Sequence, residues 1–570
     1  MTASLLVLAL LAAPSPTGPS APAGPAGGRA VVLGALQAEL ARSAARLRLD
    51  GYDAPYFIAF QVKELRTDTV AARSGALVED ESRRSRRAAV DLRVGSYDLD
   101  SSGRDDGVHF VGQDGRTWFA SREAPLDDDP AALRNALWLL ADEKYKEALA
   151  AWFKRKSRAV YRAEEPDRAP SFSREDPQRH ADPATPFAFD RGRWRDEVKR
   201  LSAAFRSHPA VLDSSVRVGA DRTVRWQVDT EGTALVTEQT LYGLHLQAVA
   251  RAVDGQLLEG SRDWYARTEA GLPAGERLRR EQEALCAELE ALRTAPVVDP
   301  SSGPALLAPE ATGVLFHEAV GHRLEGDRQD DDKEGQTFKG QVGRRVLPAF
   351  LTVTDDPTVA RAGGVDLNGA YGWDDQGVPA RRTVLVEDGV LRGYLLSRRP
   401  VKPFTRSNGH GRAQGVQAPV ARMGNLLVES KRTFPLDELR RMLREEARRQ
   451  GKPYAYVIRD ITGGNTNTAS FGYQAFKGTP RLVTRVDVAT GREELVRGVE
   501  LVGTPLSSVN RLLATSAETA AFNGFCGAES GYVPVSTVAP WALVSEVELQ
   551  RVARAHERSP ILPAPWTEAR

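Results

Sequence analysis

The sequence predicts an α+β fold, with an N-terminal α/β-type domain of sheet and long helices followed by a β-rich C-terminal domain. The first observation is length, because 570 residues exceed what one hydrophobic core usually organises. The second is a change of pattern near residue 300, where long helical stretches give way to glycine-rich, strand-like runs. We therefore assign residues 30–300 to the N-terminal domain and residues 301–570 to the C-terminal region.

Helical and strand-like patterns alternate in the N-terminal domain. Leu33–Leu49 carries leucines at helical spacing, and the run PYFIAFQVKEL from Pro55 has the aromatic and β-branched residues of a strand. Pro130–Tyr161 and Gly275–Thr294 predict two long helices. The alternating run from Ser214 predicts an antiparallel sheet with short turns.

Two further segments organise the chain. An insertion is predicted at about residues 96–193, and its last part, Pro166–Arg193, is proline-rich and charged without an apolar period. Such a pattern predicts a surface linker. Beyond residue 300, Asp388-Gly389 and Thr490-Gly491 lie between strand-like runs and predict hairpins.

Charge and hydropathy exclude two classes of partner. With 77 Lys plus Arg and 76 Asp plus Glu, the formal net charge is +1, so the chain has no overall attraction for nucleic acid. No segment beyond the N-terminus has 18 consecutive apolar residues, which predicts no membrane span in the mature chain.

The first 29 residues predict a signal peptide with a Pro/Ala/Gly tail. The apolar run Leu5–Ala13 is too short to cross a bilayer but suits the apolar region of a secretory signal. We expect export, to the periplasm. The alternative is a disordered N-terminal tail on a cytoplasmic protein, because no Lys or Arg precedes Leu5.

The segment LFHEAVGHRLEGD contains two histidines, His317 and His322, five residues apart. In a regular α-helix, residues five apart point about 140° away from each other, so the two imidazoles would not face one ion. A π-type turn brings such residues onto one face, and Gly321 is the residue type that tolerates distortion. The spacing therefore predicts a distorted metal-binding helix; two polar residues capping a helix are the alternative.

Two imidazoles leave a catalytic zinc ion one protein ligand short. Glu325, Asp327 and the distant Cys526 are candidates. Cys526 is the better choice chemically, because thiolate is a strong zinc ligand and the glycine-flanked run NGFCGAESG predicts a loop that permits close approach. A free thiol or a disulfide with Cys286, on the predicted helix Gly275–Thr294, is the alternative.

Glu318 directly follows the first histidine and is predicted to be the general base for a metal-activated water that attacks a peptide carbonyl. Glu325 and Asp327 are candidates for carboxylates that orient the imidazoles. The alternative is a solvated acidic run that extends through Glu334. We expect the metal site to lie between the two domains.

Five segments of the second half resemble the TldD/PmbA family of metallopeptidases, in the branch that retains its metal ligands. They are HEAVGHRLEGD, FKGQVGRRVLPAFLTVTDDPT, YGWDDQGVPARRTVLVEDGVLRGYLLSRRP, SNGHGRA and NGFCGAESGYVPVS. The resemblance covers about residues 30–550 and is strongest from about residue 300 onward. It implies a zinc site made by His317, His322 and Cys526, with Glu318 as the catalytic base.

The resemblance also implies partners and an alternative function. It implies a homodimer, or a heterodimer with a homologous chain, that encloses the active sites and cleaves unfolded proteins or small peptides bound as extended strands. Asn408, Gly409 and His410 align with a glycine-rich segment and are candidate substrate-binding residues; for His410 the alternatives are a proton donor or oxyanion stabiliser and a turn-stabilising residue. Because the family includes members without the metal motif, a non-catalytic peptide-binding or scaffold subunit is the alternative function, which the retained motif disfavours.

Overall fold

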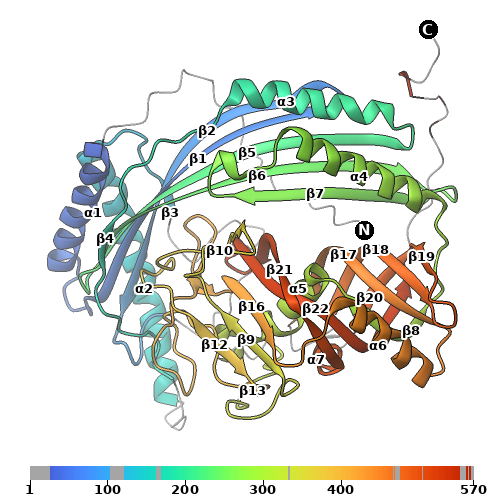
Figure 1. Ribbon diagram of the computed structural model, residues 1–570. Coiled ribbons are helices and arrows are strands. Elements are labelled where there is room, and N and C mark those ends of the chain that lie inside the picture. Colours follow the sequence, from blue (N-terminus) through green and yellow to red (C-terminus); the bar gives the residue numbers. More distant parts are fainter. Residues whose placement is uncertain are drawn as a thin grey trace.

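The chain forms two β-rich bodies, and a long curved sheet from the N-terminal half arches over the body formed by the C-terminal half (Figure 1). The computed structural model describes residues 26–102, 121–161, 169–330, 334–466, 468, 476–503, 505–552, 560, 562 and 564–566. The predicted apolar leader, Leu5–Ala13, lies outside the described residues. Among the helices of the described part, none has the length and apolar character needed to cross a membrane.

The N-terminal sheet has seven strands. They are β1 Pro55–Arg73, β2 Ala76–Val94, β3 Ser121–Glu123, β4 Arg179–Ala181, β5 Val211–Asp229, β6 Ala234–Arg251 and β7 Leu257–Ala266. Their order is β3-β2-β1-β5-β6-β4, and β7 also pairs with β6. The long strands β2, β1, β5 and β6 are antiparallel to one another, as the alternating run from Ser214 predicts, and β4 pairs with β6 in parallel.

Four helices cover one face of this sheet. They are α1 Ala26–Arg46, α2 Pro130–Tyr161, α3 Arg191–Ala204 and α4 Gly275–Thr294. On β1, Ile58 and Phe60 belong to the apolar cluster with α1 and α2, whereas Val70 belongs to the cluster with α3 and α4. Because side chains alternate along a strand, the odd-numbered side chains point to the other face, where Lys63 forms an ion pair with Asp375 of the C-terminal half at 2.7 Å.

The helix predictions hold for three of these four helices. α2 and α4 begin and end at the predicted residues, and α1 ends three residues before the predicted Leu49. α3 was not predicted, because its first residues fall in the segment assigned to a linker. The predicted insertion at about 96–193 contains β3, α2 and β4, and its residues 103–120 and 162–168 lie outside the described part.

The linker prediction for Pro166–Arg193 is wrong for the first described residues, 169–173, whereas residues 174–193 lie on the surface. Phe172 is buried, and the guanidinium of Arg398 lies 4.0 Å from the centroid of its ring. Arg398 also donates from Nε to the carbonyl of Ser173 at 3.2 Å. The residues around Phe172 are thus buried by a partner more than 200 residues away, which a search for local apolar periodicity cannot reveal.

The C-terminal sheet has eleven strands. They are β8 Ser301–Leu307, β9 Leu351–Asp355, β12 Thr383–Glu387, β13 Val390–Leu391, β16 Asn425–Ser430, β17 Tyr454–Thr466, β18 Phe476–Asp487, β19 Glu493–Val496, β20 Val499–Gly503, β21 Leu512–Ala528 and β22 Gly531–Arg551. Their order is β13-β12-β9-β16-β22-β20-β18-β17-β8, with β19 on β18 and β21 on β22. Because β8 also pairs with β22, five of these strands close into a ring.

Both predicted hairpins form. Asp388 and Gly389 join β12 to β13 with φ values of 50° and 79°, the positive pair that a tight two-residue hairpin requires. Thr490-Gly491 lies in the turn between β18 and β19. Two small hairpins complete the strands of the described part, β10 Arg361–Ala362 with β11 Val365–Asp366 and β14 Gly411–Arg412 with β15 Val420–Ala421.

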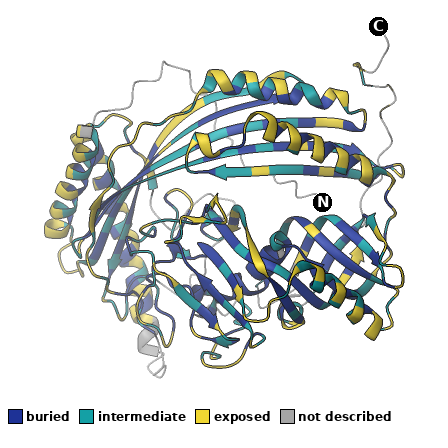
Figure 2. Cartoon of the chain, viewed as in Figure 1, coloured by how far each residue is buried: buried dark blue, intermediate teal, exposed yellow. Residues whose placement is uncertain are grey.

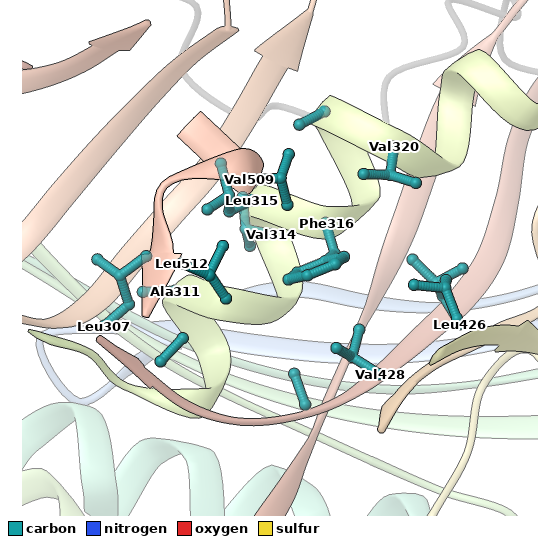
Figure 3. Close-up of a cluster of buried hydrophobic side chains, with 14 of the residues drawn as sticks. Leu307, Ala311, Val314, Leu315, Phe316, Val320, Leu426, Val428, Val509 and Leu512 are labelled. Carbon is teal, nitrogen blue, oxygen red and sulfur yellow. The ribbon is translucent and has the colours of Figure 1, made fainter. Parts of the chain in front are cut away.

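A short apolar helix, α5 Pro309–Phe316, lies in the main core of the C-terminal half. The same half contains α6 Leu436–Arg449 and α7 Pro505–Asn510. Figure 3 shows Val314 and Phe316 of α5 among apolar side chains that include Val428 of β16 and Leu512 of β21. In Figure 2 the strands around it are largely buried, while α3 and α4 expose their outer faces. This packing fixes the position of the segment that follows α5, which begins at His317.

Candidate metal centre

A π-helical turn, His317–Gly321, directly follows α5, and a 3₁₀ turn, His322–Leu324, continues it. The rings of His317 and His322 have centroids 4.9 Å apart. The wider turn therefore brings the two imidazoles together, as the five-residue spacing predicts.

Close packing explains why a glycine occupies position 321. Its φ of −54° and ψ of −56° are ordinary helical values, so the tolerance of glycine for distorted backbone does not account for this residue. A Cβ atom at this position would lie 2.1 Å from Sδ of Met423, far inside contact distance. The absence of a side chain at Gly321 is what lets the turn lie against Met423.

Cys526 reaches the two histidines from near the end of the chain. It lies on β21, close to the hairpin turn into β22, and not in the loop predicted from its flanking glycines. Its Sγ lies 3.3 Å from Nε2 of His322, and the ligand atoms of His317, His322 and Cys526 all lie within 4.8 Å of one another. Both cysteines are free thiols, so the disulfide alternative is wrong, and Cys286 is buried on α4.

The donor set fits a zinc ion. Zinc binds imidazole nitrogen at about 2.0–2.1 Å and thiolate sulfur at about 2.3 Å, so the ligand atoms of a tetrahedral site lie roughly 3.3–3.6 Å apart. A sulfur and a nitrogen ligand fall at the long end of that range, about 3.5–3.6 Å, so the 3.3 Å between Sγ of Cys526 and Nε2 of His322 is slightly shorter than in a loaded zinc site. Two imidazoles and one thiolate leave a fourth position for water, which is the arrangement of catalytic zinc sites.

The three side chains balance one another electrostatically. Burial alone would raise the pKa of the Cys526 thiol, but His322, His317 and Arg422 hold that pKa well below its usual value. Burial would likewise lower the pKa of His322, but Cys526 and Glu325 raise it well above its usual value. These opposing shifts favour a thiolate beside a cation, which is the ligand form of cysteine that zinc requires.

The two candidate orienting carboxylates behave differently. Oε2 of Glu325 lies 3.1 Å from Nδ1 of His322, which leaves Nε2 of that ring facing Cys526, the geometry of a carboxylate that orients a metal-binding imidazole. Asp327 instead accepts hydrogen bonds from Oγ of Ser397 at 3.1 Å and from the backbone N–H of Ala421 at 2.6 Å. Asp327 thus fastens two segments of the C-terminal half, and the expectation that it orients an imidazole is corrected.

Glu318 is enclosed by β17. A Cβ atom at Gly464 of this strand would lie 2.5 Å from Cγ of Glu318, so a glycine is needed for the strand to pass there. The backbone carbonyl of Glu318 accepts a hydrogen bond from Nη1 of Arg323 at 2.7 Å, and the same nitrogen donates to Oγ1 of Thr466 at 3.0 Å. Arg323 therefore ties the π-helical turn to the end of β17.

The candidate substrate-binding segment forms a buried turn. His410 is 0% exposed, its Nδ1 lies 2.9 Å from Oδ1 of Asn408, and its Nε2 lies 3.2 Å from Oδ1 of Asp355. The carbonyl of Gly409 accepts a hydrogen bond from the hydroxyl of Tyr371 at 2.9 Å. This geometry favours the turn-stabilising alternative for His410.

The site is built by the C-terminal half alone. His317, His322 and Cys526 all lie beyond residue 300, and the expectation that the metal lies between the two domains stays a prediction. The N-terminal sheet approaches the neighbouring surface, where the ring of Tyr265 on β7 lies 5.8 Å from the ring of Phe525.

Sequence reasoning did not single out two arginines of the site, Arg328 and Arg422. Both make hydrogen bonds to the hairpin that carries Cys526. Arg328 follows the metal motif within six residues of His322, but an arginine in an acidic run is typical of a solvated surface. Arg422 lies about a hundred residues from both parts of the site, so no local pattern marks it.

Comparison with known proteins relates the C-terminal half to metallopeptidases. Residues 300–551 match the family model of the PmbA/TldA metallopeptidase C-terminal domain. A metalloprotease of Archaeoglobus fulgidus is 34% identical over 40% of this chain and 48% of its own length. The zinc metalloprotease TldD homolog of Saccharolobus solfataricus is 25% identical over 43% of this chain and 51% of its own. In these matches the chain spans about half the length of each relative.

Solved structures extend the likeness to the whole fold. TldE from Thermococcus kodakarensis superposes with a TM-score of 0.59 at 14% identity, covering 87% of this chain and 97% of that one. A Thermotoga maritima structure titled as a modulator of a DNA gyrase gives a TM-score of 0.56 at 14% identity, covering 86% and 96%. The fold is therefore of the TldE type, mixed α/β with a β-rich C-terminal region. The C-terminal half, which contains all five resembling segments, matches the PmbA/TldA metallopeptidase family model over residues 300–551.

Proposed function

We propose that this protein is a zinc-dependent peptidase that hydrolyses unfolded proteins or small peptides. The observation that carries the proposal is the convergence of His317, His322 and Cys526 within 4.8 Å, directly beside Glu318. The name of the Saccharolobus solfataricus relative, a zinc metalloprotease, supports the choice of metal.

The side chains of the site divide the chemistry between them. His317, His322 and Cys526 would hold zinc, which supplies Lewis acidity toward water and the peptide carbonyl when it is bound. Glu318 accepts the proton of the attacking water and passes it to the nitrogen of the leaving amine. Because Glu318 is buried, its carboxylate acts in a medium of lower dielectric constant than water. The lower dielectric constant strengthens its electrostatic interactions with the attacking water and with the leaving amine.

The strand that carries Cys526, β21, could bind a substrate peptide in an extended conformation. In the described part of the chain, β21 pairs with the strand β22, and its other edge is bridged at Thr515 by Thr433, so the free edge is the part of β21 nearer Cys526. Hydrogen bonds from a free strand edge to a peptide backbone give affinity without demanding a side-chain sequence. A second copy of this chain or a homologous chain would enclose the site and confine it to unfolded or short substrates.

Removing and restoring the metal tests this function. A pool of denatured peptides is incubated with the zinc-loaded protein, with the protein after chelation, and with the chelated protein after zinc is returned. The proposal predicts hydrolysis that disappears on chelation and returns with zinc. Hydrolysis that persists after complete zinc removal would refute it.

A further inference from the structure

We propose that Arg328 and Arg422 are positioning residues that clamp the Cys526 hairpin onto the histidine segment through the shared carboxylate of Glu325. This inference rests on the proposed zinc site and adds how its geometry is set. Cys526 and His322 lie 204 residues apart in the sequence, on a strand and a helical turn, so their distance depends on contacts between these two elements.

Arg328 makes the first half of the clamp. Its Nε donates to Oε2 of Glu325 at 2.8 Å. Its Nη1 and Nη2 donate to the two carboxylate oxygens of Glu529 at 2.6 and 2.9 Å. Glu529 lies in the turn between β21 and β22, three residues after Cys526. A two-pronged guanidinium–carboxylate pair fixes orientation as well as distance, so Arg328 holds this turn in one position relative to Glu325.

Arg422 makes the second half and lies nearest the other carboxylate oxygen of Glu325. Its Nη2 donates to the backbone carbonyl of Cys526 at 2.6 Å. Its Nη1 donates to Oγ of Ser530 and to the carbonyl of Gly531, each at 3.0 Å. Its Nε lies 3.6 Å from Oε1 of Glu325. The side chain of Arg422 is 0% exposed, and its hydrogen bonds hold both Cys526 and the turn that follows Cys526.

Glu325 joins the two halves to the metal ligand His322. One of its oxygens contacts Nδ1 of His322 and Nε of Arg328, and the other faces Arg422. The two guanidinium groups face three carboxylates, those of Glu325, Glu529 and Glu334, the last at 3.1 Å from Nη1 of Arg328. The clamp therefore sets the distance between Sγ of Cys526 and Nε2 of His322 before an ion binds. Less conformational entropy of these side chains is then lost when the metal binds.

The variants Arg328→Met, Arg328→Lys and Arg422→Lys test the clamp. Arg497→Met is a matched control, because Arg497 is also buried in the C-terminal half, pairs with Asp254 at 2.8 Å and donates to the carbonyl of Ala295 at 2.9 Å. Zinc affinity is measured by competition with a chromogenic chelator. Cobalt is bound in place of zinc, and its thiolate-to-metal charge-transfer band reports the contact with Cys526.

We expect Arg328→Met to weaken zinc binding by about 10- to 100-fold, the usual effect of losing a partner behind a metal ligand, and to weaken and shift the cobalt charge-transfer band. Arg328→Lys restores part of the affinity, because an ammonium keeps the contact with Glu325 but not the two-pronged pair with Glu529. Arg422→Lys weakens both signals. Arg497→Met lowers stability and leaves zinc affinity and the cobalt band unchanged.

Wild-type zinc affinity and an unchanged cobalt band in folded Arg328→Lys and Arg422→Lys would overturn the clamp while leaving the zinc site intact. The two lysine variants decide the question even if Arg328→Met does not fold. Failure of the wild-type protein to bind zinc or cobalt would instead overturn the proposed function, and the clamp with it.

Discussion

Sγ of Cys526 lies 3.3 Å from Nε2 of His322, although the two residues are 204 positions apart in the sequence. The contact joins the β21–β22 hairpin to the π-helical turn after α5. A change in either residue must therefore alter a site that both elements build.

Glu318→Gln separates metal binding from catalysis. The amide cannot accept the proton of the attacking water, so hydrolysis of a denatured peptide pool should fall by about 10²- to 10⁴-fold, while zinc content stays at the wild-type level. Glu276→Gln, on the surface helix α4, serves as the control and should change neither property. Wild-type turnover in Glu318→Gln, with its zinc content confirmed, would rule out Glu318 as the base.

Thiol reactivity should depend on the metal at only one of the two cysteines. Bound zinc should protect Cys526. After chelation the neighbouring imidazoles and Arg422 hold the pKa of its thiol low despite burial, so Cys526 should react quickly with a thiol reagent near neutral pH. Burial raises the pKa of Cys286 to about 12, so Cys286 should react slowly under both conditions. The measurement is the rate of thiol labelling with and without chelator, and Cys526→Ala should abolish the fast phase. No labelling in either condition, even after denaturation, would indicate a disulfide.

Local sequence patterns predicted the elements whose determinants are local. The helices Pro130–Tyr161 and Gly275–Thr294 follow from their apolar period, the hairpin at Asp388-Gly389 follows from its turn residues, and the π-helical turn follows from the spacing of His317 and His322. In each case the residues that decide the structure lie within a few turns of one another.

Features that depend on distant partners were missed or misjudged. The segment around Phe172 was assigned to a linker because its partner, Arg398, lies 226 residues away (398 minus 172). The role of Gly321 depends on Met423, about a hundred residues onward. Arg422 contacts Cys526 across 104 residues. Cys526 is the one distant residue that the sequence predicted as a metal ligand, and the reason was its side chain, because thiolate is a preferred zinc ligand.

Gly321→Ala should destabilise the fold through overpacking. The added methyl would lie 2.1 Å from Sδ of Met423, so we expect the free energy of unfolding to fall by roughly 1–3 kcal/mol. Gly34→Ala on α1, where a Cβ atom meets nothing within 4 Å, is the control and should raise the free energy of unfolding by up to about 1 kcal/mol. The measurement is urea denaturation of both variants.

The double variant Gly321→Ala with Met423→Ala identifies the cause. Shortening Met423 removes the clash, so the loss in the double variant should be smaller than the sum of the two single losses by more than about 0.5 kcal/mol. Additive losses would show that Gly321 is required for a reason other than contact with Met423.

Glu310→Gln should change how stability depends on pH. Burial and the facing carboxylate of Asp460 raise the pKa of Glu310 to about 8, from a usual value of 4.5. The folded state then keeps a proton that the unfolded chain releases, so the stability that Glu310 contributes is complete below pH 4.5 and is lost as the pH rises through 8. A glutamine does not ionise, so the stability of the variant relative to wild type should increase between about pH 5 and pH 8.5. Urea midpoints at the two pH values measure this, and an equal difference at both would contradict the raised pKa.

Elemental zinc analysis tests the central claim most directly, applied to the purified wild-type chain and to His322→Ala, Cys526→Ala and Cys286→Ala. The account predicts a single zinc ion per chain in the wild type and in Cys286→Ala, and strongly reduced zinc in His322→Ala and Cys526→Ala. Full zinc content in all four proteins would show that these side chains do not bind the metal.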